Sequence, residues 1–332
     1  MNLPNRYRCL QTIETPTGPN TQLVSLPLSE LTSGEVLIRV HYSSLNYKDG
    51  LATQAHRGVI KSLPHTPGID AAGVILECNS SRFTVGQEVI VTGYELGQSH
   101  WGGWSEYIRV PIDWIVPLPA PLTLRQSMVL GTAGFTAAQC VLALQRAGLS
   151  SEHGPIVVSG ASGGVGCWAV SMLSHLGFQV TAATGKKEAN DLLLACGATR
   201  VIDRQELVES SRRPMLSARW AGAVDTVGGQ ILNTILRSTK YGGCVAACGL
   251  TAGSDLNMTV FPFILRGVQL AGVASADCPY AHRLEIWQTI SSTLLTSLPA
   301  DMVTEVALEQ LLDRVADILA GKISGRVVVR VA

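Results

Sequence analysis

The chain contains 332 residues, of which 46% are hydrophobic and 15% are charged, and its formal net charge is zero. This length and apolarity are sufficient for two cores, so we expect two domains. The balanced charge argues against a nucleic-acid partner or a charged membrane surface. No apolar run looks long enough to span a bilayer, and residues 1–6 lack the apolar core of a signal peptide. With eight cysteines and no C-x-x-C motif, the composition predicts a cytoplasmic protein without a membrane partner.

The first third of the chain predicts a β-rich domain. Short stretches that alternate between apolar and polar residues are separated by the turn formers Gly, Pro, Asn and Ser. These stretches are Arg8–Glu14, Glu35–Tyr42, Gly73–Cys78, Glu88–Thr92 and Trp104–Val110. We therefore expect residues 1–124 to form most of an irregular, partly closed β-domain.

Residues 125–272 change to an alternation of strands and helices. Six strands with helical crossovers are typical of a doubly wound parallel sheet in an α/β protein. The predicted strands are Ile156–Ser159, Val180–Ala183, Arg200–Ile202, Gly222–Asp225, Gly243–Ala247 and Val268–Val273. Residues 273–332 are expected to return to the β-rich domain. Their predicted elements are a helix after Pro279 through Trp287, a helix over Leu312–Leu319 and a strand over Gly325–Val331.

A glycine-rich turn follows the first of these strands and precedes a segment with helical spacing. Its residues are Ser162, Gly163, Gly164, Val165 and Gly166. Glycines let a backbone approach phosphates, and free N–H groups at a helix start favour negative charge. Two glycines fit the G-x-G-x-x-G pattern, while Ala161 occupies the first position. We predict that the turn binds the pyrophosphate of a dinucleotide, with a purely structural turn as the alternative.

The end of the second strand bears on which dinucleotide is bound. An NAD site places Asp or Glu on the ribose hydroxyls about 20 residues beyond the glycines. This chain has Thr184, Gly185, Lys186 and Lys187 there. Two ammonium groups and a hydroxyl suit a 2′-phosphate, which predicts NADPH. The alternative is that the lysines only solvate a loop.

Several motifs in a fixed order carry a family resemblance. They are Asn46–Asp49, Pro67–Gly73, Gly86–Val89, Gly131–Ala137, Gly163–Gly166 and Asp225–Gly229. With them the chain resembles the zinc-independent quinone-oxidoreductase branch of the medium-chain dehydrogenase/reductase superfamily. Three shorter segments are similar to its acrylyl-CoA reductase subgroup: Thr92–Gly97, Pro262–Gly267 and Gly325–Val327. The resemblance implies a Rossmann domain inserted into a GroES-like catalytic domain, and a homodimer that pairs through the edge strand Val268–Val273.

The same resemblance speaks against a metal. Catalytic zinc needs three ligands from Cys, His or carboxylate. Zinc-dependent relatives carry Cys where this chain has Asn46 and His where it has Ile69, and Met128 stands at the third position. We expect no metal.

Asn46, Tyr47, Lys48 and Asp49 are the catalytic candidates. Hydride transfer to an activated C=C bond without a metal requires positioned donors and the exclusion of water. Tyr47 is the candidate proton or hydrogen-bond donor, and Lys48 would favour its ionised form. Asn46 would orient substrate or ribose. Asp49 would pair with Lys48 or hold the bend, and the alternative for the whole stretch is an ordinary turn.

The resemblance adds further site residues to those of the glycine-rich turn and of the stretch Thr184–Lys187. Those expected at the cofactor are Thr132, Thr136, Ser162, Gly163, Gly164, Val165, Thr184, Lys186, Arg204, Cys248, Gly249, Leu250 and Arg326. Those expected at the substrate are Arg57, Tyr94 and Arg266. A helix cap is the alternative for Thr132, and a solvated surface position is the alternative for Arg204.

The sequence therefore predicts NADPH-dependent reduction of an activated C=C bond in a small α,β-unsaturated carbonyl compound. The preferred reaction converts acrylyl-CoA to propionyl-CoA. One alternative is an NADPH:quinone or general enone reductase. Another is a non-catalytic NADPH-binding protein.

Overall fold

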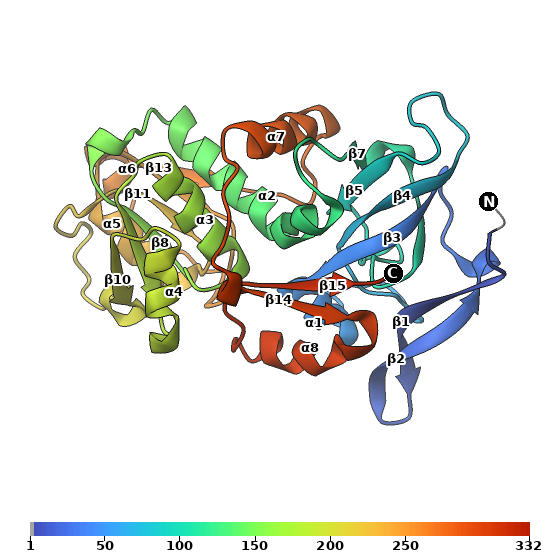
Figure 1. Cartoon of the computed structure of the whole chain (residues 1–332). Coiled ribbons are helices and arrows are strands. Elements are labelled where there is room, and N and C mark those ends of the chain that lie inside the picture. The colour runs from blue at the N-terminus through green and yellow to red at the C-terminus, as the bar shows by residue number, and fades with distance from the viewer. Residues whose placement is uncertain (1–2) are drawn as a thin grey trace. The chain divides into compact units, whose positions relative to one another are not determined.

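The computed structural model describes residues 3–332, which form two compact units (Figure 1). Unit 1 comprises the chain up to Thr132 together with Ala276–Ser291 and Val303–Ala332, and unit 2 comprises Ala133–Ser275 and Ser292–Met302. The first unit is rich in antiparallel strands, and the second contains a parallel sheet with helical crossovers. The predicted α/β fold class is confirmed.

Unit 1 is built around a seven-stranded sheet whose order is β14-β15-β3-β4-β5-β7, with β6 also pairing with β3. Its strands are β3 (Val36–Leu45), β4 (Asp70–Cys78), β5 (Glu88–Thr92), β6 (Tyr107–Val110), β7 (Ile115–Pro117), β14 (Val303–Ala307) and β15 (Arg326–Arg330). Its helices are α1 (Tyr47–Thr53), α7 (Tyr280–Ser292) and α8 (Leu312–Leu319). Strand β3 pairs with three neighbours, and its Val36, Ile38 and Val40 are buried in the core of this unit.

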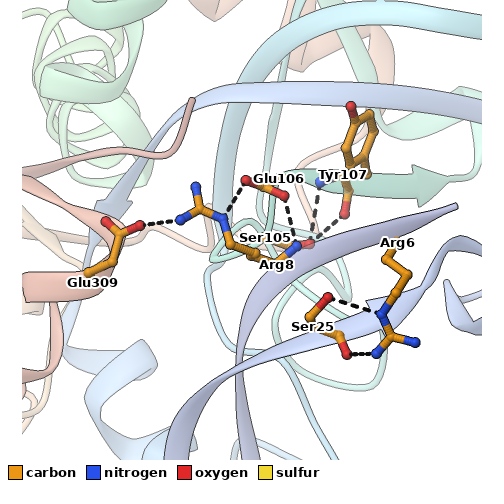
Figure 2. Close-up of polar contacts among 7 residues, drawn as sticks. All are labelled: Arg6, Arg8, Ser25, Ser105, Glu106, Tyr107 and Glu309. Carbon is orange, nitrogen blue, oxygen red and sulfur yellow. Dashed lines mark hydrogen bonds and ion pairs between the residues drawn. The ribbon is translucent and has the colours of Figure 1, made fainter. Parts of the chain in front are cut away.

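A two-stranded ribbon of β1 (Arg6–Thr15) and β2 (Gly18–Pro27), also part of unit 1, is joined to the rest of that unit by polar contacts (Figure 2). The backbone N–H and Nε of Arg8 each donate to the Glu106 carboxylate at 2.8 Å, and Arg8 Nη1 donates to Glu309 at 2.6 Å. Glu309 lies in a short 3₁₀ helix, Leu308–Gln310. One arginine therefore joins the ribbon to two distant segments.

Unit 2 contains a six-stranded sheet of order β10-β9-β8-β11-β12-β13, all parallel. Its strands are β8 (Ile156–Ser159), β9 (Val180–Thr184), β10 (Arg200–Asp203), β11 (Trp220–Asp225), β12 (Thr239–Ala247) and β13 (Gln269–Gly272). Its helices are α3 (Gly164–His175), α4 (Asn190–Ala195), α5 (Gly229–Ser238) and α6 (Phe261–Arg266). Val157, Ala223 and Val245, on three adjacent strands, are fully buried, as expected where helices cover both faces of a sheet. The predicted six strands are confirmed.

The long helix α2 (Leu124–Arg146) crosses the boundary between the two units in sequence. Gly131 interrupts it with φ 52° and ψ −158°, values that favour glycine. Contrary to the expectation from sequence, this helix has the length and hydropathy of a membrane span, with a mean hydropathy of 1.5 in its most apolar window. Within the structure, 78% of that window is buried, and a helix in the core of a protein is apolar for the same reason.

The structure adds elements that the sequence pattern did not predict, notably α1, β2 and β14. Strand β2 has no buried residue, so it has no alternating apolar face to signal it. The polar stretch that starts at Asn46 was expected to be a bend. It is instead the start of α1, with Asn46 in an extended conformation at the N-cap position.

Candidate active site

The glycine-rich turn of unit 2 joins β8 to α3. Ala161 occupies the position of the first glycine in the fingerprint. The positive φ falls one residue earlier, at Gly160, which adopts φ 59°. A Cβ on Gly166 would lie 2.3 Å from the carbonyl oxygen of Gly160, so only glycine permits this close packing of helix on turn. Gly163 is the N-cap of α3 and has no side chain to cap it. The first N–H groups of this helix are therefore open to an anion.

Asp225, at the end of β11, forms hydrogen bonds with the strand that leads into this turn. Its carboxylate accepts hydrogen bonds from Ser159 Oγ at 2.6 Å and from Gly228 N at 2.8 Å. Thr226 Oγ1 donates to the Ser159 carbonyl at 2.9 Å. Burial raises the pKa of Asp225. No role for this residue follows from the sequence pattern, in which its only signal is its place in the motif Asp225–Gly229.

A second loop, after β9, gathers the residues expected at a 2′-phosphate. Thr184 Oγ1 lies 2.9 Å from Ser162 Oγ and accepts a hydrogen bond from Lys186 N at 3.1 Å. A Cβ on Gly185 would lie 2.8 Å from Arg204 Nε, which places the Arg204 guanidinium against this loop. Within residues 3–332, no carboxylate lies within 4.0 Å of that guanidinium. The structure thus brings Thr184, Lys186 and Arg204 together.

Lys186 differs from its neighbour Lys187 in burial. Lys186 is half-buried, and this burial lowers the pKa of its ammonium group. Lys187 is exposed and begins a short 3₁₀ helix, Lys187–Ala189. Of the two lysines, it is Lys186 whose backbone N–H donates to Thr184 Oγ1.

The segment after β12 is held by backbone contacts at the same ends of the strands. Cys248 N donates to the Asp225 carbonyl at 2.9 Å. A Cβ on Gly249 would lie 2.1 Å from the Thr226 carbonyl oxygen, so glycine is required there as well. Leu250 is 67% exposed and Thr136, on α2, is buried. The predicted Cys248–Leu250 segment therefore lies next to the glycine-rich turn through Asp225 and Thr226.

In unit 1, Asp49 is a fully buried carboxylate that holds the start of α1. Its Oδ2 accepts from Asn46 N at 2.8 Å and from Asn46 Nδ2 at 3.2 Å, and its Oδ1 accepts from Ile69 N at 2.8 Å. The expected pairing with Lys48 is wrong, because Lys48 Nζ donates to Gln98 Oε1 at 3.3 Å instead. The contacts of Asp49 agree with its other expected role, which is to hold this segment in place.

Asp70 is the centre of a second buried network, and the sequence did not single it out. Its carboxylate accepts hydrogen bonds from Ser44 Oγ at 2.6 Å, from Asn46 Nδ2 at 2.9 Å and from Thr132 Oγ1 at 2.5 Å. Thr132 N also donates to both of its oxygens, at 3.1 and 3.0 Å. Arg326 Nη1 donates to Asn46 Oδ1 at 3.2 Å and Nε donates to the Val129 carbonyl at 2.9 Å. Asn46 therefore directs its side-chain amide into the protein.

We expect Asp49 to make stability depend on pH. Burial and, secondarily, the Asp70 carboxylate raise the pKa of Asp49 to about 7. Because an unfolded Asp titrates near 3.9, the folded state binds this proton more tightly. Its stabilising effect is complete below about pH 4 and is lost as the pH rises to about 7, by on the order of a few kcal/mol. Denaturant unfolding at pH 5 and pH 8 measures the change.

The control for this measurement is Asp49→Asn, in which no carboxyl group titrates at that position. Three histidines act in the opposite sense, since burial lowers the pKa of His41, His65 and His100. The difference between the two proteins removes their effect. If both proteins change equally in stability between pH 5 and pH 8, Asp49 does not carry the proton.

The remaining predicted residues fall in different settings. Tyr47 is 47% exposed at the first position of α1, and Arg57 is exposed after α1. Tyr94 has φ 52°, a strained value for a bulky residue. The guanidinium of Arg266 donates to the carbonyls of Leu216, Arg237 and Thr239 at 2.7 to 3.2 Å. The contacts of Arg266 are those of a structural residue, not of a substrate ligand.

Arg283, on α7, contacts the turn that contains Tyr94, and the sequence pattern indicated only packing or a surface pair for it. It is fully buried and donates to Thr92 O at 2.6 Å and to Ala276 O at 2.8 Å. Its guanidinium carbon lies 4.2 Å from the centre of the Tyr94 ring, a cation–π distance. Tyr94 N donates to the same Ala276 carbonyl at 2.9 Å.

The residues at the zinc-ligand positions do not fit a metal ion. Ile69 and Met128 are buried apolar side chains, and the Asn46 amide is directed at two carboxylates and an arginine. In the described part of the chain, no three His, Cys, Asp or Glu side chains are grouped as metal ligands.

Comparison with known proteins identifies the family of this chain. Residues 32–120 match the alcohol dehydrogenase GroES-like domain, and residues 164–292 match the family described as zinc-binding dehydrogenase. Acrylyl-CoA reductase AcuI of Ruegeria pomeroyi is 48% identical over 81% of this chain and 82% of its own length. A provisionally named quinone oxidoreductase of Bacillus subtilis, YhfP, is 46% identical over 87% of both chains.

Solved structures agree with this placement. The yhdH oxidoreductase of Salmonella enterica, in complex with NADP, has a TM-score of 0.95 at 43% identity and covers 98% of this chain and 100% of its own. The yhfP structure, with NAD bound, has a TM-score of 0.94 at 44% identity and covers 99% and 100%. The fold is that of a nicotinamide-dependent oxidoreductase. The chain belongs to the quinone-oxidoreductase-like family of medium-chain dehydrogenases/reductases.

Proposed function

We propose that this protein uses NADPH to reduce the activated C=C bond of a small α,β-unsaturated carbonyl compound, with acrylyl-CoA as substrate and propionyl-CoA as product. The observation that carries the proposal is the hydrogen-bonded network around Asp70 in unit 1, which includes Asn46 and Thr132. Its side chains do not form a set of metal ligands. The 48% identity to an acrylyl-CoA reductase supports the thioester as substrate.

NADPH fits the second unit for reasons of charge and space. The open N–H groups of α3, next to Gly163, suit the pyrophosphate, and Thr184, Lys186 and Arg204 suit the 2′-phosphate. The Gly249 segment is held close to the ends of the strands, where ligands of doubly wound sheets bind. The yhfP structure contains NAD. The preference for NADPH over NADH is therefore tested directly, by substitution of Lys186.

The cofactor, once bound, supplies a hydride to the β-carbon of the substrate. The chain must then stabilise the developing enolate oxygen and protonate the α-carbon. Tyr47 is our candidate donor because its side chain is 47% exposed, whereas the Asn46 amide is directed into the protein. Arg57 and Tyr94 are proposed at the substrate, and Arg266 is withdrawn from that role.

Removing the Tyr47 hydroxyl tests its role. For Tyr47→Phe we expect kcat to fall by roughly 10²-fold or more, as is typical when a general acid is lost, while the affinity for NADPH changes little. Tyr241→Phe is the matched control, because it removes an exposed phenol from unit 2. A kcat within a factor of a few of the wild type would assign the proton to water.

The proposed substrate is tested by following NADPH oxidation with acrylyl-CoA, benzoquinone and a simple enone at matched concentrations. We expect kcat/KM to be highest for acrylyl-CoA by orders of magnitude, since contacts to the CoA moiety would contribute to transition-state binding. Equal values would favour a general enone or quinone reductase. Tight NADPH binding without oxidation by any of the three would favour a non-catalytic NADPH-binding protein.

We also propose a cytoplasmic homodimer that pairs through β13. This strand is at the edge of the unit 2 sheet, and its Leu270 is 39% exposed. An unpaired strand edge of this kind readily accepts another strand. Sedimentation at micromolar concentration should give the mass of two chains, and a single-chain mass would contradict the proposal.

A further inference from the structure

The hydrogen bonds around Asp70 have a fixed direction that limits what Thr132 can offer to a ligand. Both oxygens of the Asp70 carboxylate face the backbone N–H of Thr132, at 3.1 and 3.0 Å, so both act as acceptors there. The same Oδ1 lies 2.5 Å from Thr132 Oγ1. A threonine hydroxyl carries a single hydrogen. That hydrogen is directed at Asp70, so Thr132 Oγ1 can only accept a further hydrogen bond.

Thr132 is less buried than the carboxylate that holds its hydroxyl. Asp70 is completely buried, but Thr132 is partly exposed. It directly follows Gly131, where α2 is interrupted. A Cβ on Gly131 would lie 2.6 Å from Asp70 Oδ2, so the glycine is what allows the backbone to approach this carboxylate. The break in the helix brings Thr132 N and Oγ1 to Asp70 at the same time.

We propose that Asp70 is a positioning residue that fixes the Thr132 hydroxyl as a hydrogen-bond acceptor, so that Thr132 receives an N–H or O–H group of the bound dinucleotide. The inference rests on the proposed function and on the position at the cofactor that the family resemblance implies for Thr132. Two groups of the cofactor have the required chemistry: the carboxamide N–H of the nicotinamide and a ribose hydroxyl. Thr132 supplies no proton to the substrate.

The test measures binding of NADP⁺ without substrate, by titration calorimetry, so it does not depend on activity. Thr132→Val removes the acceptor and keeps the shape of the side chain, and Thr132→Ser keeps the hydroxyl. We expect Kd to rise about 10-fold for the valine variant, as for the loss of a single hydrogen bond. The serine variant should stay within about threefold of the wild type. A valine variant with wild-type affinity would overturn the proposal.

An analogue distinguishes the two donor groups of the cofactor. The 3-acetylpyridine form of NADP⁺ has a methyl group in place of the carboxamide nitrogen. If the carboxamide donates to Thr132, the wild type binds this analogue more weakly than NADP⁺, and Thr132→Val binds both equally. If a ribose hydroxyl donates, the valine variant loses the same factor for both ligands. Either result supports an accepting Thr132.

The role of Asp70 is tested by combining variants. In Asp70→Asn, the amide nitrogen can donate to Thr132 Oγ1, which releases the hydroxyl hydrogen from its fixed direction. If Asp70 acts through Thr132, adding Thr132→Val to Asp70→Asn should raise Kd by less than about twofold. A full 10-fold effect in the Asp70→Asn background would show that Asp70 does not set the polarity of Thr132. Failure of acrylyl-CoA reduction by the wild type, with these binding results intact, would refute the proposed substrate alone.

Discussion

Replacing Lys186 with Asp should lower the preference for NADPH over NADH, measured as the ratio of kcat/KM values, by roughly 100-fold. The change removes a favourable charge from the loop beside Thr184 and Arg204, and it adds a carboxylate that repels a 2′-phosphate. Each of these effects corresponds to about tenfold in affinity. The loss should be in KM for NADPH and not in kcat, because the 2′-phosphate is bound equally in the ground and transition states.

Lys187→Asp provides the control for this experiment. It makes the same change of charge one residue away, at an exposed side chain that begins the 3₁₀ helix. At moderate salt an exposed charge is largely screened, so the preference should change by less than about threefold. Equal effects of the two substitutions would mean that the loop acts only through its net charge and that Lys186 does not contact the phosphate.

Replacing Gly166 with Val should abolish measurable binding of NADPH, with Kd rising by at least about 100-fold. A Cβ at this position would lie 2.3 Å from the Gly160 carbonyl oxygen and 2.6 Å from Ala161 Cα. Both are backbone neighbours, so α3 must move away from the turn, and overpacking of this kind typically costs about 1–3 kcal/mol of stability. Fluorescence titration with NADPH and denaturant unfolding measure the two effects.

Gly272→Val is the matched control, because nothing lies within 4 Å of a Cβ added there. We expect this variant to bind NADPH with wild-type affinity. Retained binding by Gly166→Val would mean that the turn adapts to the larger side chain, and that the close packing of helix on turn is not needed to hold the cofactor.

The elements predicted best are those whose burial leaves a strong local pattern. Strands β8 and β5 and helix α8 have the predicted bounds, Ile156–Ser159, Glu88–Thr92 and Leu312–Leu319. A strand buried on both faces is a short, continuous apolar run, and an amphipathic helix repeats its apolar residues every three or four positions. The exposed ribbon strand Gly18–Pro27 has neither signal, so it was not predicted.

The short helix α1 was missed for a different reason. The residue types of Asn46–Asp49 are common in turns and equally common at helix starts. What favours the helix is that the Asp49 carboxylate accepts from Asn46 N and from Ile69 N. The second of these contacts joins residues 20 positions apart, and a local pattern contains no information about it.

The sequence by itself determined the class of this protein, because a glycine-rich turn between a buried strand and a helix is a local pattern tied to phosphate binding. The cluster around Asp70 was decided only by the tertiary structure. It joins Asp70 to Asn46 and to Thr132, which are 24 and 62 positions away, and Arg326 to Asn46 across 280 positions. Side chains so far apart in the chain meet only after the strands that carry them have paired, and hydrogen-bond direction is defined only once they meet.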